Sequence, residues 1–179
     1  MEMEELNKSG KIKIVEVHTE MAVYYSRPKL ESLSQKDRLS FIRQVRHLSL
    51  KELGMKMGIP SSQSKYRIWR MERKGRDIPP DVRSKVCEAL DINPKMLEKW
   101  SFRDPEDLYY MLLWMEELYP DFVLKNISRI SPKTDTIKAL AKRYAEWKVM
   151  KKKYADGKIT YEEYWDWKLR KLDEKGNRE

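Results

Sequence analysis

Several kinds of residue and segment are scarce in this 179-residue chain, and each shortage excludes a class of protein. One cysteine, Cys87, excludes a disulfide within the chain, and two histidines are too few for a metal cluster. The longest apolar runs, such as residues 109–115, are far shorter than the roughly 20 residues that cross a bilayer. The acidic start, MEMEE, is unlike a secretory signal. We therefore expect a soluble cytoplasmic protein with no metal, no cofactor and no membrane contact.

Positive charge is concentrated in the middle of the chain. The net charge is +9, and residues 35–100 hold 16 Lys and Arg against 8 Asp and Glu. Residues 1–34 hold 5 against 6, and residues 101–179 hold 17 against 15. A localised basic region is typical of a protein that binds nucleic acid. The other interpretation is a charged surface that only contacts water.

The first part of the chain, residues 1–34, is predicted to be a β-strand arm. The stretch KIKIVEVHTEMAVYY, residues 11–25, alternates apolar and polar side chains and is rich in β-branched residues. Pro28 ends the pattern. The arm either packs on the body of the protein or presents an edge strand that is free to pair.

Residues 35–100 show the periodicity of five short helices, which together predict a compact all-α unit. Ser49 and Glu52 have the spacing of a capping box at the start of the second helix, and Gly58 suits its end. The third helix is expected to begin at Ser61 or Ser62 and to end near residue 74. The remaining helices are expected to begin at Gln35, at Pro79-Pro80 and at Asn93-Pro94, the last ending at Trp100.

Residues 101–179 predict a C-terminal helical region. Its first helix begins near Pro105 and ends at Pro120. A long helix from Thr134 and a last helix, joined by a turn at Asp156-Gly157, form an αα-hairpin, and Thr160 and Glu163 suit a second capping box. The first helix has an apolar stripe that we expect to face inward: Leu108, Met111, Leu112, Met115 and Leu118. The predicted fold class is thus mainly α.

The stretch from Leu39 to Leu97 contains an ordered series of motifs. The series comprises an Arg in the first helix (Arg43 or Arg46), LS-x-x-x-L (Leu48, Ser49, Leu53), a turn Gly (Gly58), I-x-x-I-E (Ile68, Met71, Glu72) and A-L-x-I (Ala89, Leu90, Ile92). The series resembles the helix-turn-helix regulators of the Xre and phage-repressor type. There are two departures: Gly54 replaces a small Ala, and about four extra residues, Ser61–Ser64, precede the third-helix pattern. Similar insertions, and a similar C-terminal αα-hairpin, occur in a clostridial subset of that family.

The resemblance implies a five-helix helix-turn-helix DNA-binding domain at residues 35–100, whose third helix lies in the major groove of double-stranded DNA. Ile68 and Met71 would face inward, and Gln and Arg are the side chains that bond adenine and guanine bidentately. The residues expected to contact bases are Gln63, Arg67 and Arg70, with Lys65 and Tyr66 contacting either bases or phosphates. The residues expected to contact phosphates are Ser49, Lys51, Arg73, Lys74 and Arg76.

Three features outside that domain have their own interpretations. The last helix has more aromatic side chains than one buried face needs, and we predict a dimer or partner surface there: Tyr161, Tyr164, Trp165 and Trp167. The run Lys151–Lys153 is either a solvated helix end or an auxiliary phosphate contact. Cys87 is expected to be a packed thiol rather than a nucleophile, and we assign no catalytic residue.

Two functions follow from these patterns. The first is a sequence-specific transcriptional regulator, a homodimeric repressor or autoregulator of a bacterial or mobile-element operon. The alternative is a phage or mobile-element inhibitor of the anti-CRISPR type, which binds a CRISPR nuclease–nucleic acid complex through the same basic scaffold. The N-terminal arm, absent from the minimal family, keeps the alternative open. A regulator binds duplex DNA unaided, whereas an inhibitor binds the nuclease complex.

Overall fold

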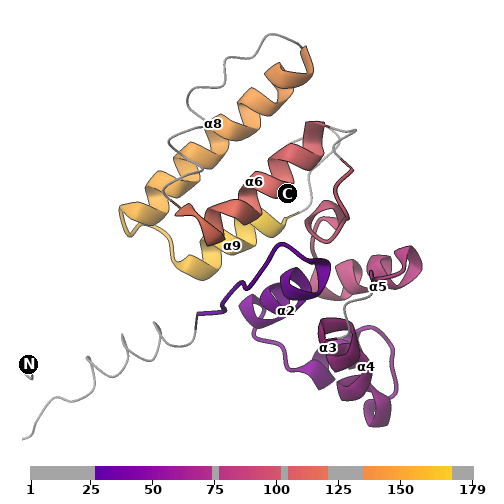
Figure 1. Cartoon of the computed structure of the whole chain (residues 1–179). Coiled ribbons are helices and arrows are strands. Elements are labelled where there is room, and N and C mark those ends of the chain that lie inside the picture. The colour runs from indigo at the N-terminus through magenta and orange to yellow at the C-terminus, as the bar shows by residue number, and fades with distance from the viewer. Residues whose placement is uncertain (1–26, 74–76, 102–104, 121–134, 171–179) are drawn as a thin grey trace, which may run out of the picture.

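The computed structural model describes residues 27–73, 77–101, 105–120 and 135–170, and this part of the chain is mainly helical (Figure 1). The predicted strand, residues 11–25, lies outside the described residues, and the described end of the arm, residues 27–34, has neither helix nor strand. None of the described helices is both long and apolar enough to cross a membrane. In chain order the elements are α2 (Gln35–Val45), α3 (Leu50–Lys56), α4 (Ser61–Arg73), α5 (Pro80–Leu90), the 3-10 helix η1 (Pro94–Met96), α6 (Pro105–Leu118), α8 (Asp135–Ala155) and α9 (Tyr161–Leu169).

Local capping signals place the helix ends where the sequence predicts them. In α3 the Ser49 side chain accepts the backbone N–H of Glu52, and the Glu52 side chain accepts the N–H of Ser49. Thr160 and Glu163 form the same reciprocal pair at the start of α9. Gly58 follows α3 with a φ of 75°, a conformation that glycine adopts without strain.

The third helix begins at Ser61 and ends at Arg73, as the sequence predicts. The four extra residues of the family comparison, Ser61–Ser64, form the first turn of α4 and do not lie before it. One expected boundary is wrong. The fifth helix is a single 3-10 turn that ends at Met96 instead of Trp100.

The backbones of α3 and α4 approach closely at Gly54. A β-carbon placed on Gly54 would lie 2.5 Å from Ser64 Cβ and 2.7 Å from Ser64 Cα. Ser64 is fully buried, and its hydroxyl lies 2.8 Å from the carbonyl oxygen of Ile59. Glycine at position 54 is therefore required by the crossing of the two helices.

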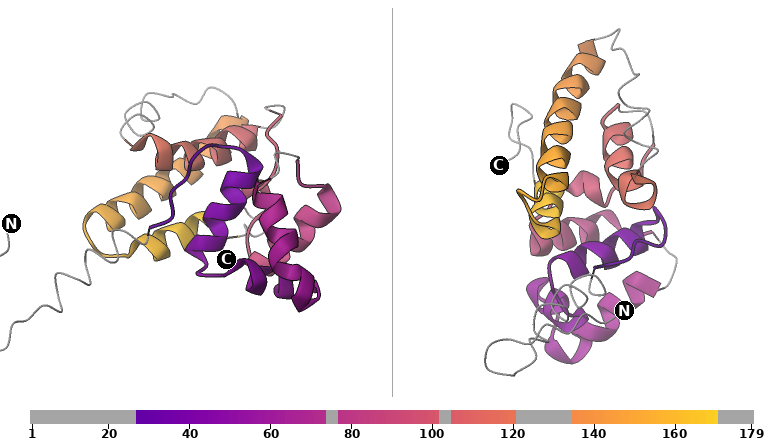
Figure 2. Two further views of the ribbon diagram at one scale, coloured as in Figure 1. Left: turned by 60° about the horizontal axis from the view of Figure 1, so that its bottom comes forward. Right: turned by 90° about the vertical axis from the view of Figure 1, so that its left-hand side faces the viewer.

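One hydrophobic core extends across the boundary predicted near residue 100. Phe41 of α2 lies edge-on to Trp114 of α6 and to Trp165 of α9, with ring centroids 5.6 and 4.6 Å apart. The two indoles lie 5.0 Å apart. In both Figure 1 and the right-hand view of Figure 2, α8 lies at the end of the molecule opposite α3 and α4. Helix α2 is thus shared by two groups of helices that have no separate cores.

Polar side chains fix the other buried edge of α2. The Gln35 amide donates to the carbonyl oxygen of Leu97 (2.7 Å) and accepts the backbone N–H of Ile78 (3.0 Å). Arg38, only 1% exposed, donates to the carbonyl oxygen of Met96 (2.7 Å) and lies 4.1 Å from the Trp100 ring centroid. Burial, helped by the nearby Arg83, lowers the pKa of Arg38 to about 10, so the guanidinium stays charged at neutral pH. These contacts join α2 to the η1 region.

Helix α6 buries a different face from the one its aliphatic stripe predicts. Leu108 is 39% exposed, and the other members of that stripe are only partly buried. The side chains that are fully covered are Tyr109, Tyr110, Leu113 and Trp114. Large rings contribute more buried area than the aliphatic residues between them, and the buried phenol of Tyr110 accepts a hydrogen bond from the Asn93 side chain (2.9 Å).

A buried ion pair joins α6 to α9. The Nζ of Lys168, 1% exposed, lies 2.6 Å from Oε2 of Glu116, which is 5% exposed. The same oxygen accepts the Tyr164 hydroxyl (2.8 Å) and the Trp147 indole N–H (3.1 Å), and Lys151 lies 2.9 Å from Oε1. Burial alone would raise the pKa of Glu116, but Lys168 and Lys151 outweigh it and lower that pKa. Glu116 is therefore charged at neutral pH.

The contact at Gly54 gives the first prediction. Gly54→Ala should lower the free energy of unfolding in urea, because overpacking against Ser64 costs about 1–3 kcal/mol. The preference of helices for Ala, about 1 kcal/mol, offsets only part of this. The loss should be smaller in a Ser64→Gly background, which lacks the nearest atom. A Gly54→Ala protein as stable as the wild type would contradict the close crossing.

The buried ion pair predicts an acid-sensitive stability. The lowered pKa of Glu116 means that its contribution is present above about pH 4.5, the ordinary value, and is lost as pH falls through the folded-state pKa. Glu116→Gln should cost about 3–5 kcal/mol at pH 7, since Lys168 stays buried without its counter-charge. Urea unfolding of the wild type at pH 7 and pH 4 measures the acid sensitivity, and urea unfolding of Glu116→Gln at pH 7 measures the loss of the ion pair. Glu88→Gln, an exposed position on α5, is the control and should change stability by less than about 0.5 kcal/mol.

Candidate nucleic-acid interface

The outward face of α4 is basic and aromatic. All five side chains predicted to contact bases are exposed, namely Gln63, Lys65, Tyr66, Arg67 and Arg70. Trp69 and Arg73 are exposed beside them, while Ser64 and Ile68 are fully buried and Met71 is half-buried. Among the described residues, no ion pair reaches Lys65, Arg67, Arg70 or Arg73. Their positive charge is available to a partner.

The exposed side chains do not all point the same way. Successive residues of an α-helix are rotated by about 100° around its axis. Measured from the buried Ile68, this rotation places Gln63, Tyr66, Arg70 and Arg73 near the centre of the outward face. Lys65 and Arg67 are two positions apart and lie on opposite flanks. The two flanking cations therefore cannot reach the same line of contacts as the central four.

A bidentate ion pair holds α4 against α2. Nε of Arg43 lies 2.6 Å from Oε1 of Glu72, and its Nη2 lies 2.9 Å from Oε2. The third guanidinium nitrogen donates to the carbonyl oxygen of Leu48 (2.8 Å), in the segment before α3. The two side chains are only 13% and 8% exposed. Arg43, rather than Arg46, is thus the arginine that joins the first helix to Glu72.

The two helix N-termini near this face differ in charge. At α3, the N–H groups of Ser49 and Glu52 are already bonded, and the hydrogen bonds from Ser49 lower the pKa of Glu52. A negative carboxylate therefore lies at the start of α3, near the place where a phosphate was expected, and the phosphate contact at Ser49 stays a prediction. The first turn of α4 has no acidic residue. Lys51 is exposed on α3, as its prediction requires.

A groove of about 460 Å³ runs between α2 and α4. Trp69 and Arg73 line it from α4, and Leu50 lines it from α3. Its cations are accompanied by acidic side chains, Glu31, Asp37 and Glu72. The groove is therefore mixed in charge, unlike the outward face of α4. Lys74 and Arg76, which were predicted to contact phosphates, lie outside the described residues.

The aromatic residues predicted to form a dimer surface belong to the core. Tyr161, Tyr164 and Trp165 are 9%, 4% and 0% exposed, and Trp167 is half-buried. The Tyr161 hydroxyl donates to Glu117 Oε1 (2.8 Å). Burial, with the neighbouring carboxylates, raises the pKa of Tyr161 and of Tyr164. The prediction of an exposed partner surface at these residues is wrong. Their rings are covered by α2 and α6 as well as by α8, the other helix of the αα-hairpin.

The three lysines of the run on α8, residues 151–153, differ in their surroundings. Lys151 pairs with Glu116 and is not available for phosphate, whereas Lys152 and Lys153 are exposed. Elsewhere, Cys87 is buried as predicted. In the described ranges, no three His, Cys, Asp or Glu side chains gather as metal ligands would.

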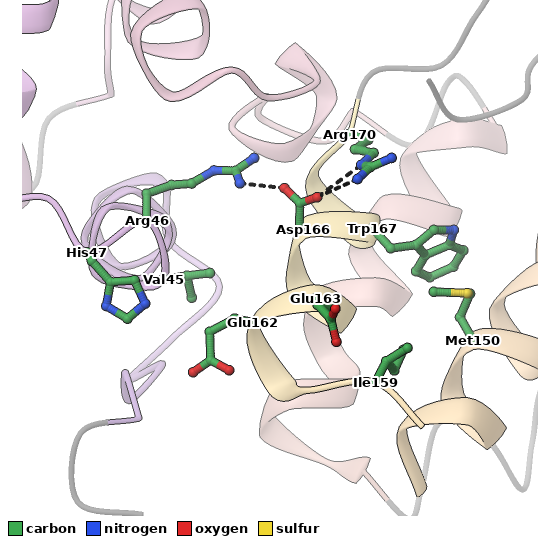
Figure 3. A pocket seen from close by; sticks show the side chains of 10 residues that line it. All are labelled: Val45, Arg46, His47, Met150, Ile159, Glu162, Glu163, Asp166, Trp167 and Arg170. Carbon is green, nitrogen blue, oxygen red and sulfur yellow. Dashed lines mark hydrogen bonds and ion pairs between the residues drawn. The ribbon is translucent and has the colours of Figure 1, made fainter. Parts of the chain in front are cut away.

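A second concavity, of about 430 Å³, lies between the end of α2 and helices α8 and α9 (Figure 3). Asp166 lies between Arg46 and Arg170 and bonds to both guanidinium groups, so these charges on the rim are paired within the chain. The two arginines outweigh burial and lower the pKa of Asp166. Met150, Ile159 and Trp167 supply the apolar part of the wall. This concavity offers fewer available charges than α4.

Comparison with known proteins finds no match among family models, curated proteins or solved structures. The functional argument therefore depends on the residues of the chain and their geometry. Within the described residues, the exposed face of α4 brings cations, an amide and aromatic rings together on one helix.

The ion pair behind α4 gives a prediction. Glu72→Ala should cost about 3–5 kcal/mol in urea unfolding, because Arg43 would be left largely buried without its counter-charge. Asp77→Ala is the matched control. It breaks the ion pair between Asp77 and Lys99, whose side chains are 70% and 74% exposed respectively. The loss should be about 1 kcal/mol or less. Equal losses in the two variants would mean that the Arg43–Glu72 pair does not hold α4 in place.

Proposed function

We propose that this chain is a sequence-specific DNA-binding regulator in which α3 and α4 form a helix-turn-helix and α4 enters the major groove. The observation that supports it most is the outward face of α4, where four exposed cations are left without a partner in the described residues. A helix presented in this way fits the major groove, which is wide enough to admit one.

The geometry behind α4 agrees with the family resemblance. The pattern requires an Arg in the first helix and a Glu late in the third, and Arg43 and Glu72 form a bidentate pair at these positions. The pattern also requires a small residue in the second helix, and Gly54 is the point where the two backbones meet. Both contacts hold the basic face away from the core.

Each exposed residue of α4 then has a role set by its direction. Gln63 and Arg70, at the centre of the face, would contact base edges, because Gln and Arg bond adenine and guanine bidentately. Lys65 and Arg67, on opposite flanks, would contact the phosphates of the two groove walls. Arg73, at the end of the helix, and Lys51 would do the same from either side. Regulation would follow from occupancy of the site, as in a repressor of a bacterial or mobile-element operon.

Self-association stays a prediction for which the described residues assign no surface, because the aromatic residues first proposed for it are buried. Dimeric regulators bind two half-sites about one helical turn apart, so the spacing of half-sites in a selected sequence tests it.

Salt dependence tests the DNA proposal. If about five phosphates are engaged per chain, the affinity for a fluorescent duplex should fall with a log–log salt slope of about −4 to −5. Arg70→Ala should weaken binding by about 1–3 kcal/mol and relax the preference at one base pair. Lys148→Ala, an exposed position, removes the same charge from α8, the helix that lies opposite α3 and α4, and should change affinity less than twofold (Figure 1). A slope near zero, or equal losses in the two variants, would overturn the proposal.

A further inference from the structure

Two exposed aromatic side chains on α4 lie against each other. Tyr66 is 57% exposed and Trp69 is 42% exposed. Their ring centroids are 6.1 Å apart and the ring planes are inclined by 25°, which is a stacked arrangement. The other large apolar side chains with high exposure are Met55, Leu108, Tyr119 and Val149. In the described part of the chain, these four side chains make no ring contact with one another. Tyr66 and Trp69, both on α4, are the exposed large side chains that do.

The surroundings of the pair indicate the chemistry of its partner. Lys65, Arg67, Arg70 and Arg73 are exposed on the same helix as the two rings, and no acidic side chain of α4 is available, because Glu72 is bonded to Arg43. An apolar protein face would leave these cations buried without counter-charges, which is costly. A polyanion that also offers apolar contacts satisfies both requirements, and duplex DNA is such a partner.

The two rings occupy different places on the helix. Tyr66 lies near the centre of the outward face, three residues after Gln63 and four residues before Arg70, which are neighbouring positions on a helix. Trp69 lies toward α2 and lines the groove between α2 and α4. The indole therefore lies against the phenol ring, and Tyr66 still keeps more than half of its surface exposed.

In the major groove, the apolar group on a base edge is the 5-methyl group of thymine, which cytosine lacks. A phenol ring between Gln63 and Arg70 would lie along the line of base edges. We propose that Tyr66 contacts the 5-methyl group of a thymine, and that Trp69 is a positioning residue that holds the Tyr66 ring in place. The proposal rests on the DNA-binding function above and adds a specificity-determining residue to it.

Replacing thymine by uracil removes only the methyl group and so tests the contact directly. A duplex recovered by selection from a random pool is synthesised with each thymine changed to uracil in turn, and its affinity is measured by anisotropy. With the wild-type protein, uracil at one thymine per contacted half-site should weaken binding about fourfold, the value of one buried methyl group.

Protein variants assign that effect to a residue. Tyr66→Ala should bind thymine and uracil duplexes equally, whereas Arg67→Ala should weaken both and keep the fourfold ratio. Trp69→Ala should reduce the ratio toward one, and Trp69→Phe should restore most of it. Both aromatic positions are exposed, so the variants should unfold at the wild-type temperature, which thermal unfolding checks.

The outcomes separate this inference from the proposed function. Steep salt dependence with no sensitivity to uracil would overturn the thymine contact and leave DNA binding intact. A thymine preference that persists in Tyr66→Ala would also overturn it. Tighter binding to the single strand than to the duplex would mean that the rings stack on unpaired bases, and no duplex binding at all would overturn both proposals.

Discussion

The close crossing of α3 and α4 at Gly54 is the constraint on which the rest of the arrangement depends. With only a hydrogen atom at Gly54, the buried Ser64 lies directly against the backbone of α3. This fixes which side of α4 is buried, and by the period of the helix it also fixes which side faces outward. The Arg43–Glu72 pair then attaches the far end of α4 to α2. Two contacts, one steric and one ionic, thus determine the direction of every exposed cation on that helix.

Helix α2 has a second set of contacts on which the C-terminal helices depend. Phe41 packs against Trp114 and Trp165, and Arg46 bonds to Asp166 of α9. A truncation that removes α8 and α9 would therefore expose Phe41 and leave Arg46 without its acidic partner. Residues 35–100 therefore share a hydrophobic core with the C-terminal helices. The C-terminal helices support α2, and through α2 they support α4.

Structural features that depend on neighbouring residues in the sequence could be predicted, whereas features that depend on contacts between distant residues could not. Ser49, Gly58 and Thr160 mark helix ends because a cap needs only the residues next to it. The exposed face of α4 also followed from its period once Ile68 was placed inside. By contrast, the period of α6 allowed two apolar faces, and only the packing of Trp114 against Phe41 selects between them.

Buried charge was the feature hardest to predict. Lysine and glutamate are usually found on the surface, and nothing near Lys168 or Glu116 in the sequence shows that these two side chains meet inside the core. Because the network includes the Tyr164 hydroxyl and the Trp147 indole, it also explains how so many polar aromatic rings can be buried. An excess of aromatic residues on a helix predicted a partner surface, whereas the partners are other helices of the same chain.

The most direct test of the central claim, that α4 is the DNA-contacting element, is amide chemical-shift mapping of the ¹⁵N-labelled full chain during titration with duplex DNA. The account predicts that the largest changes fall at residues 61–73 and at the start of α3, including Lys51. The exposed Lys148 and Lys152 belong to α8, the helix that lies opposite α3 and α4, and should not shift (Figure 1). Changes confined to α8, or none in α4 at saturating DNA, would contradict it.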